Sequence, residues 1–239
     1  MCNSECISFV ERAVGPDDVK GRALIEIGSY DVNGSVRPYL ESLAPASYVG
    51  VDINPGPGVD LVCDAEHLLD RFGPESFDVV ISTELLEHVR DWRAVITGMK
   101  RLARPGGLIV ITTRSLGFPI HGYPDDYWRY EPTDMRVIFG DCAIELLDVD
   151  RSEPGVFVAA RRPAAERFEP FDLSGYALCS PHTGTRTLTP DTPELPESAR
   201  SDDECARLAA ELAALRATKT LRYTAKLRGA YARLRARLR

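Results

Sequence analysis

The chain has 239 residues, of which 44% are hydrophobic and 27% are charged, and its formal net charge is −7. This length suffices for one domain of ordinary size with shorter appendages. It contains no apolar run of the roughly 18–20 residues that cross a bilayer, and its first residues do not resemble a secretory signal. We therefore expect a cytoplasmic protein without a membrane-spanning helix.

The charge is unevenly distributed along the chain. Residues 201–239 contain ten Lys and Arg against four Asp and Glu, so the first 200 residues are strongly acidic. A nucleic-acid substrate would require a basic face on the main domain, because the phosphate backbone dominates such binding. The composition therefore argues against nucleic acid as the substrate.

The cysteines give no sign of a metal or redox site. Six of them occur, at positions 2, 6, 63, 142, 179 and 205, without paired Cys-x-x-Cys spacing. We expect free thiols in a reducing compartment and no metal site.

Short apolar runs alternate with helical segments in the first half of the chain. Five runs are predicted strands: 22–28, 47–53, 59–64, 77–82 and 108–113. Each is short and apolar and ends at a turn, as in buried parallel strands. Helices are predicted between them at about 34–44, 66–72 and 91–103. Because right-handed crossovers place such helices on both faces of a sheet, the pattern predicts a doubly wound α/β fold.

The last strands follow a different pattern. After a loop at 115–131 and a helix that starts near Pro132, two strands at 144–149 and 156–160 are joined by a short turn. This turn is too short for a helical crossover, so the pair must be an antiparallel hairpin. We expect a mostly parallel seven-stranded sheet that ends in an antiparallel hairpin.

The chain divides into four predicted segments. These are an N-terminal helical segment at 1–19, the main domain at 20–162, a Pro- and Thr-rich linker at 163–200 and a basic amphipathic helix at 201–239. Within the last segment, residues 219–239 hold eight basic residues and no acidic one. This tail could therefore contact an anionic membrane surface or an acidic protein, which would make the protein peripheral at the inner face of the membrane.

Acidic residues lie at the ends of the predicted strands. Glu26 precedes Gly28 by two residues, Asp52 ends the second strand and Asp64 ends the third. Ligands of open parallel sheets bind at this edge, and an acid about twenty residues after a glycine turn can accept the hydroxyls of a ribose. These acids suit a dinucleotide cofactor as well as a methyl donor.

Two motifs favour the methyl donor. The run 25–28, Ile-Glu-Ile-Gly, resembles the first motif of class I S-adenosylmethionine-dependent methyltransferases, although the loop 28–34 is two residues longer and lacks the middle glycine. The run 77–89, which contains Thr-Glu-Leu-Leu-Glu-His, resembles the fourth-strand motif of the same family, and Pro-Gly-Gly at 105–107 resembles its fifth-strand turn. The resemblance implies the class I fold, methyltransferase activity and S-adenosylmethionine as the cofactor.

The resemblance also implies ten cofactor-binding positions: Glu26, Gly28, Ser29, Gly34, Asp52, Ile53, Asp64, Ala65, Thr83 and Glu84. Glu26 would anchor the amino end of the donor, and Asp52 would accept the ribose hydroxyls. Asp64 and Ala65 would contact the adenine, unless Asp64 only caps a helix. Thr83 and Glu84 would lie under the donor, whereas His88 could be structural or catalytic.

The loop after the fifth strand contains the candidate catalytic residues. Methyl transfer to a hydroxyl needs a group that removes the proton, and a positioned base contributes about 10²–10⁴-fold. His121 is the predicted base, with Asp125 or Asp126 either orienting it or acting directly. The alternative is a loop that only packs on the domain through its aromatic residues.

The predicted reaction is O-methylation of a small-molecule or glycan hydroxyl. The glycan hypothesis rests on the tail, which resembles terminal segments beside glycan-modifying enzymes of bacterial polysaccharide pathways. Two alternatives remain open: an NAD(P)-dependent oxidoreductase, against which the fourth-strand motif argues, and a non-catalytic binding module that keeps the methyltransferase fold.

Overall fold

The computed structural model describes residues 3–32, 34–122, 125–165 and 167–191. The predicted basic helix at 201–239 and the end of the predicted linker lie outside these residues. The N-terminal segment forms two helices, α1 (Ser4–Ala13) and α2 (Pro16–Val19). None of the helices in the described part of the chain is long and apolar enough to span a bilayer.

Seven strands form the main sheet, in the order β3-β2-β1-β4-β5-β7-β6. Their bounds are Ala23–Ile27 (β1), Ser47–Asp52 (β2), Leu61–Val62 (β3), Phe77–Thr83 (β4), Ala103–Arg114 (β5), Ala143–Val149 (β6) and Gly155–Arg161 (β7). Strands β1 to β5 pair in parallel, whereas β7 is antiparallel to both β5 and β6. The predicted fold class, a mostly parallel seven-stranded sheet with a terminal antiparallel hairpin, is confirmed.

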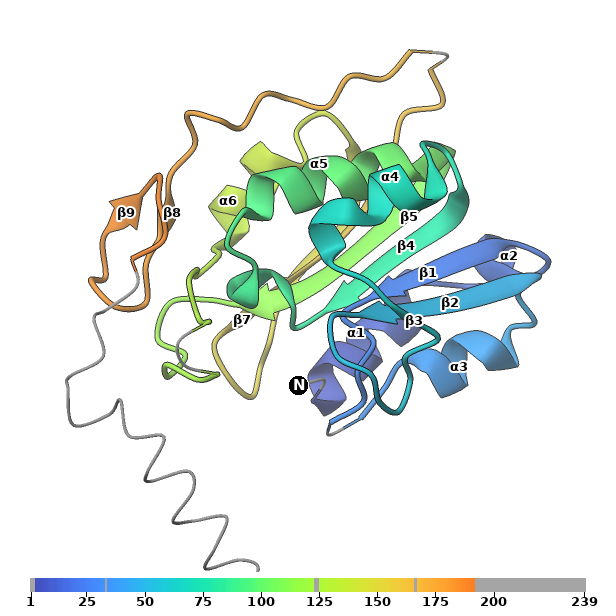
Figure 1. The fold of residues 1–239 in the computed structure, drawn as a ribbon, viewed down its shortest axis with the longest axis horizontal. Coiled ribbons are helices and arrows are strands. Elements are labelled where there is room, and N and C mark those ends of the chain that lie inside the picture. Colours follow the sequence, from blue (N-terminus) through green and yellow to red (C-terminus); the bar gives the residue numbers. More distant parts are fainter. Residues whose placement is uncertain (1–2, 33, 123–124, 166, 192–239) are drawn as a thin grey trace, which may run out of the picture. The chain divides into compact units, whose positions relative to one another are not determined.

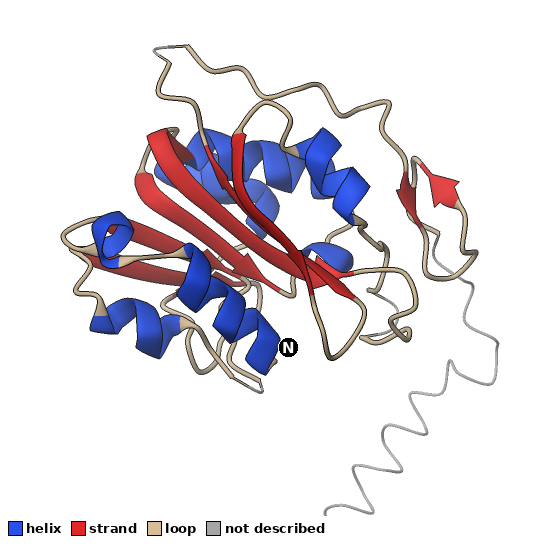
Figure 2. Ribbon diagram, turned by 180° about the vertical axis from the view of Figure 1, so that it is seen from behind, coloured by secondary structure: helices blue, strands red, loops and turns tan. Residues whose placement is uncertain are grey.

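Helices cover both faces of this sheet (Figures 1 and 2). On one face, α1, α2 and α3 (Arg37–Ser42) pack through a cluster that includes Phe9, Val19 and Leu40. On the other face lie the 3-10 helix η1 (Ala65–His67), α4 (Leu68–Phe72), η2 (Leu86–His88), α5 (Trp92–Leu102) and α6 (Pro132–Ile138). The result is a three-layer arrangement in which the sheet is buried on both sides.

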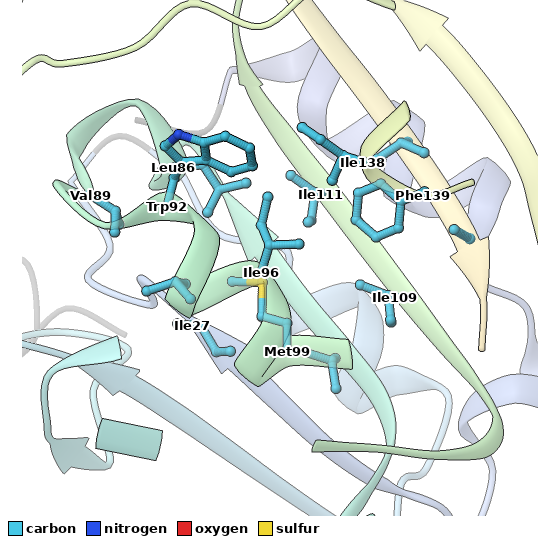
Figure 3. Packing of buried hydrophobic residues seen from close by; sticks show 14 of the residues in the cluster. Ile27, Leu86, Val89, Trp92, Ile96, Met99, Ile109, Ile111, Ile138 and Phe139 are labelled. Atoms are coloured by element: carbon cyan, nitrogen blue, oxygen red, sulfur yellow. The ribbon is translucent and has the colours of Figure 1, made fainter. Parts of the chain in front are cut away.

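Helix α5 illustrates how the sequence positions these layers. Asp91 caps its first turn by accepting a hydrogen bond from the backbone N–H of Ala94 at 3.1 Å. Trp92, Ile96 and Met99 recur at spacings of three and four residues, so they share one face of the helix, and all three are buried. Figure 3 shows this face against apolar side chains of β1 and β5.

The prediction of a linker at 163–200 is partly wrong. Strands β8 (Leu178–Cys179) and β9 (Arg186–Thr187) pair in a small antiparallel sheet, and Leu178 is fully buried. The Arg93 guanidinium on α5 donates hydrogen bonds to the backbone carbonyls of Leu173 at 2.9 Å and Tyr176 at 2.5 Å. Composition indicated a linker, but these tertiary contacts attach the segment to the domain.

The predicted helix at 34–44 is shorter in the structure. Helix α3 begins at Arg37, with Pro38 in its first turn, where the missing N–H of proline costs no hydrogen bond. Gly34 therefore lies in the loop before the helix and not at its first turn.

Candidate active site

Two cavities adjoin at the carboxyl ends of β1, β2 and β4, with volumes of about 260 and 280 Å³. Gly28, Asp52, Ile53, Leu85 and His88 line both of them. The cavities lie where the strand order reverses between β1 and β4, which is the usual ligand position in open α/β sheets.

The structure brings together the ten predicted cofactor positions. Eight of them line the first cavity: Glu26, Gly28, Ser29, Gly34, Asp52, Ile53, Thr83 and Glu84. The remaining two, Asp64 and Ala65, line the second cavity. Their individual roles stay predictions, but their common location agrees with one extended ligand that spans both cavities.

The turn after β1 passes very close to the loop after β4. Gly28 has a φ of +82°, and a Cβ atom there would lie 2.9 Å from the Cβ of Leu85. A larger residue would be strained by the backbone angle and would also collide with Leu85. Glu84, at the end of β4, itself has a φ of +54°, a conformation that costs energy for a residue with a side chain and that recurs at functional sites.

Glu26 is a buried carboxyl at the base of the first cavity. The Tyr48 hydroxyl donates a hydrogen bond to its Oε2 at 2.5 Å, and the Arg37 guanidinium lies over the Tyr48 ring. Burial raises the pKa of Glu26 to about 7, although the Tyr48 hydrogen bond and the Arg37 charge oppose this shift. The carboxyl is therefore poised to ionise when a cationic group binds beside it.

Asp52 and Ile53 separate the two cavities. One carboxylate oxygen of Asp52 accepts a hydrogen bond from the backbone N–H of Asn54 at 2.9 Å, which holds the side chain at the end of β2. The neighbouring Ile53 is 63% exposed, an unusual exposure for a large apolar residue, and its surface borders both cavities. An acid beside an exposed apolar surface suits a ribose joined to a flat aromatic base.

Asp64 performs the capping role that was one of its two predicted interpretations. Its Oδ1 accepts a hydrogen bond from the backbone N–H of Glu66 at 2.9 Å, which caps η1. Asp64 also lines the second cavity beside Ala65, so capping does not remove it from the site. The cap holds Asp64 in a fixed orientation at the cavity edge.

The predicted catalytic residues lie in the loop between β5 and α6. The backbone N–H of His121 donates to Asp126 Oδ2 at 2.8 Å, and His121 Nδ1 lies 3.1 Å from the same oxygen. Asp126 is fully buried, and Arg129 donates to its two oxygens at 2.5 and 2.8 Å. Burial raises the pKa of Asp126, but the hydrogen bonds from Arg129 and His121 outweigh it and hold this pKa well below its usual range. Both oxygens of Asp126 are thus engaged by Arg129 or His121.

Asp125 borders the second cavity. The Tyr127 hydroxyl donates to its Oδ1 at 2.5 Å, and its backbone carbonyl lies 2.5 Å from His88 Nδ1. Because a carbonyl can only accept a hydrogen bond, this contact requires a proton on His88 Nδ1.

Glu87, which was not among the predicted site residues, lies between the two histidines. Glu87 is fully buried, and its Oε2 accepts a hydrogen bond from the Thr113 hydroxyl at 2.8 Å. Its Oε1 lies 3.9 Å from His88 Nε2 and 3.8 Å from His121 Nε2. The sequence signal was the acid directly before His88 in the fourth-strand motif, but its contact with His121 could not be read from the sequence.

The hydrogen bonds around His121 affect its proposed role. The hydrogen bond with Asp126 and the negative charges of Asp126 and Glu87 raise the pKa of His121 to about 9, although burial opposes the shift. At neutral pH this imidazole is therefore doubly protonated and positively charged. As a base, His121 can act only after it has lost one of these protons.

Comparison with known proteins relates part of the chain to methyltransferases. Residues 26–111 match the family described as methyltransferase domain. A probable phthiotriol/phenolphthiotriol dimycocerosates methyltransferase 2 of Mycobacterium ulcerans is 33% identical over 113 residues, which cover 42% of this chain and 43% of that protein. The chain thus spans less than half the length of the curated relatives that it matches first.

Solved structures support the fold. Phosphoethanolamine N-methyltransferase 2 of Haemonchus contortus, in complex with S-adenosyl-L-methionine, matches with a TM-score of 0.51 and 16% identity over 66% of this chain and 52% of that one. The 1,6-didemethyltoxoflavin-N1-methyltransferase of Burkholderia thailandensis, with S-adenosylhomocysteine bound, matches with a TM-score of 0.50 and 14% identity over 60% and 72%. The predicted cofactor agrees with both ligands. The fold is therefore that of class I methyltransferases, and residues 26–111 resemble a methyltransferase domain.

Proposed function

We propose that the protein is an S-adenosylmethionine-dependent methyltransferase that methylates a hydroxyl group of a small molecule or a glycan. The observation that carries the proposal is the pair of adjoining cavities at the β1–β4 reversal, around which all ten predicted donor positions gather. The methyltransferase-domain match over residues 26–111 supports the same reaction.

The residues that line the two cavities favour one orientation of the donor. Its ammonium group belongs in the first cavity, where Glu26 supplies a buried carboxyl. Its ribose belongs at Asp52, which borders both cavities, and its adenine belongs in the second cavity beside Ile53 and Ala65. In this orientation the sulfonium lies between the two ends, near the loop that contains Leu85 and His88.

The reaction is an in-line displacement. The acceptor oxygen attacks the methyl carbon, a carbon–oxygen bond forms, the carbon–sulfur bond breaks and its electron pair moves to sulfur. Alignment of the two reactants and exclusion of water provide much of the rate enhancement. The hydroxyl proton must also leave, and within the proposal this step involves His121, oriented by Asp126, beside His88 and Asp125.

The glycan acceptor remains a proposal from the sequence of the tail. We propose the tail itself as a peripheral contact with an anionic membrane or a protein partner. Deleting the gene and comparing sugar-containing products by mass spectrometry tests the acceptor class, because the correct product should lose 14 mass units per missing methyl group, roughly one CH₂.

Calorimetry distinguishes this function from an NAD(P)-dependent oxidoreductase. The purified protein should bind S-adenosylmethionine and S-adenosylhomocysteine but neither NAD nor NADP. Asp52→Ala should weaken donor binding by about 1–3 kcal/mol, because a charge-assisted pair of hydrogen bonds to the ribose is lost. Saturable binding of a nicotinamide cofactor, without heat from either sulfur ligand, would overturn the assignment.

A further inference from the structure

Three side chains from two distant segments direct ligand atoms at one point beside the second cavity. Glu87 and His88 belong to η2, after β4, whereas His121 belongs to the loop after β5. The ligand atoms that these residues offer all lie within 4.8 Å of one another. Glu87 Oε1 lies 3.8 Å from His121 Nε2 and 3.9 Å from His88 Nε2.

These separations suit a small metal ion. Bonds from zinc to imidazole nitrogen or carboxylate oxygen are about 2.0–2.2 Å long, so two atoms on one ion can be at most about 4.4 Å apart. Both measured separations from Oε1 are below that limit, and only small side-chain movements are needed to bring the cluster onto one ion.

The groups behind the cluster point each ligand atom inward. His121 Nδ1 is 3.1 Å from the Asp126 carboxylate, and His88 Nδ1 is 2.5 Å from the Asp125 carbonyl. A carboxylate or carbonyl behind a histidine is the usual outer partner of a metal-binding imidazole, because it fixes the proton on one nitrogen and the lone pair on the other. The Thr113 hydroxyl donates a hydrogen bond to Glu87 Oε2, which leaves Oε1 facing the histidines.

Glu87 Oε1 is the strongest single indication. It belongs to a fully buried side chain, and it has no hydrogen-bond partner of proper geometry among the described residues. A buried carboxylate oxygen without such a partner is costly, and buried charges are normally paired or coordinate a metal. Here the oxygen points to two imidazole nitrogens that are too far away for a hydrogen bond but close enough to share an ion.

We propose that Glu87, His88 and His121 form a binding site for one divalent transition-metal ion of the zinc class. Two imidazoles and one carboxylate favour such an ion over Mg²⁺ or Ca²⁺, which prefer oxygen ligands. Three protein ligands leave a coordination position open, as in catalytic zinc sites. His88 lines both cavities, so the site is accessible from the cavity side.

The consequence for catalysis rests on the proposed function. With the ion bound, His121 acts as a metal ligand and not as the base: an acceptor hydroxyl at the open position would lose its proton to solvent more readily, because the ion stabilises the resulting alkoxide. The alkoxide oxygen would then form the bond to the methyl carbon, and the electron pair of the broken carbon–sulfur bond would go to sulfur. Acceptors with a second oxygen next to the reacting hydroxyl would be favoured, because they can chelate the ion.

Metal titration of the purified, chelator-treated full chain tests the site without donor or acceptor. We expect Co²⁺ to bind with one equivalent per chain and to show the visible absorption of a low-symmetry site, Zn²⁺ to displace it stoichiometrically, and excess Mg²⁺ to leave it unchanged. X-ray absorption of the Zn²⁺ form should show two imidazoles. Absence of Co²⁺ absorption up to millimolar metal, in protein that still binds S-adenosylhomocysteine, would overturn the metal site and leave the proposed function standing.

Single variants identify the ligands. His88→Ala and His121→Ala should each weaken Co²⁺ binding by at least about 100-fold, and Thr113→Val should weaken it by about 10–100-fold through the orientation of Glu87. His67→Ala, which removes an exposed histidine of η1, is the matched control and should bind as tightly as the wild type. Wild-type affinity in both His88→Ala and His121→Ala, or a two-oxygen, imidazole-free spectrum of the bound Zn²⁺, would refute the assignment.

Discussion

Binding of the methyl donor should depend on pH through Glu26. In the free protein, burial raises the pKa of this carboxyl to about 7, so at pH 6 most molecules hold it protonated and uncharged. The proposed partner, the ammonium group of the donor, pairs with the ionised form. Donor binding must therefore expel a proton below pH 7, and the affinity should fall as the pH falls through this value.

The magnitude follows from the ionised fraction. With a pKa of about 7, the fraction of Glu26 that is ionised is about 0.1 at pH 6 and about 0.75 at pH 7.5. Since apparent affinity scales with the competent fraction, the dissociation constant should be about 8-fold weaker at pH 6. Each donor molecule bound should release about 0.9 proton at pH 6 and about 0.25 at pH 7.5.

Calorimetric titration of S-adenosylhomocysteine in buffers of different ionisation enthalpy measures both quantities. Glu26→Gln should weaken binding and remove the pH dependence, because the amide cannot titrate. Asp52→Asn is the matched control: it should also weaken binding but keep the pH dependence and the proton release. Equal proton release by wild type and Glu26→Gln at pH 6 would refute the assignment of the ammonium to Glu26.

Three further predictions concern catalysis, stability and the tail. His121→Ala should lower turnover by about 10²–10⁴-fold while donor affinity changes little, because the loop faces the acceptor. Steady-state kinetics with the identified acceptor checks this prediction, and an unchanged rate would make His121 structural. Lys100 is fully buried, and both oxygens of Asp141 lie 2.7 Å from its Nζ. Asp141→Asn should therefore lower the free energy of unfolding in urea by about 3–5 kcal/mol, because it leaves the buried Lys100 charge unpaired, whereas the double variant Lys100→Met with Asp141→Leu should lower it little. Equal losses in the two variants would contradict the ion-pair argument. Truncation after Arg200 should leave donor binding intact but abolish salt-sensitive co-sedimentation with anionic vesicles. The reason is that eight basic residues, at about 1 kcal/mol each, can hold the tail at a charged surface. Equal sedimentation of the full-length and the truncated protein would exclude this role.

Features that depend on short stretches of chain were predictable from the sequence. The strands follow from apolar runs, and the antiparallel β7 follows from the short turn at 150–155, because a short turn cannot complete a crossover. The donor positions share one edge because the carboxyl ends of parallel strands converge. Each strand therefore brings its own terminal residue, such as Glu26 or Asp52, to the same place.

Features that depend on contacts between distant segments were decided only by the tertiary structure. Composition indicated a linker at 163–200, yet Leu178 is buried and Arg93 binds the backbone of the same segment. His121 was predicted as a base from its loop alone, but its raised pKa comes from Asp126 beside it and from Glu87, 34 positions earlier in the chain. The pKa of a side chain depends on the charges and hydrogen bonds that surround it in space. The sequence by itself predicted which residues end the strands at the site, and the packing of β4, β5 and their loops brought Glu87 to His121 and determined the surroundings of both.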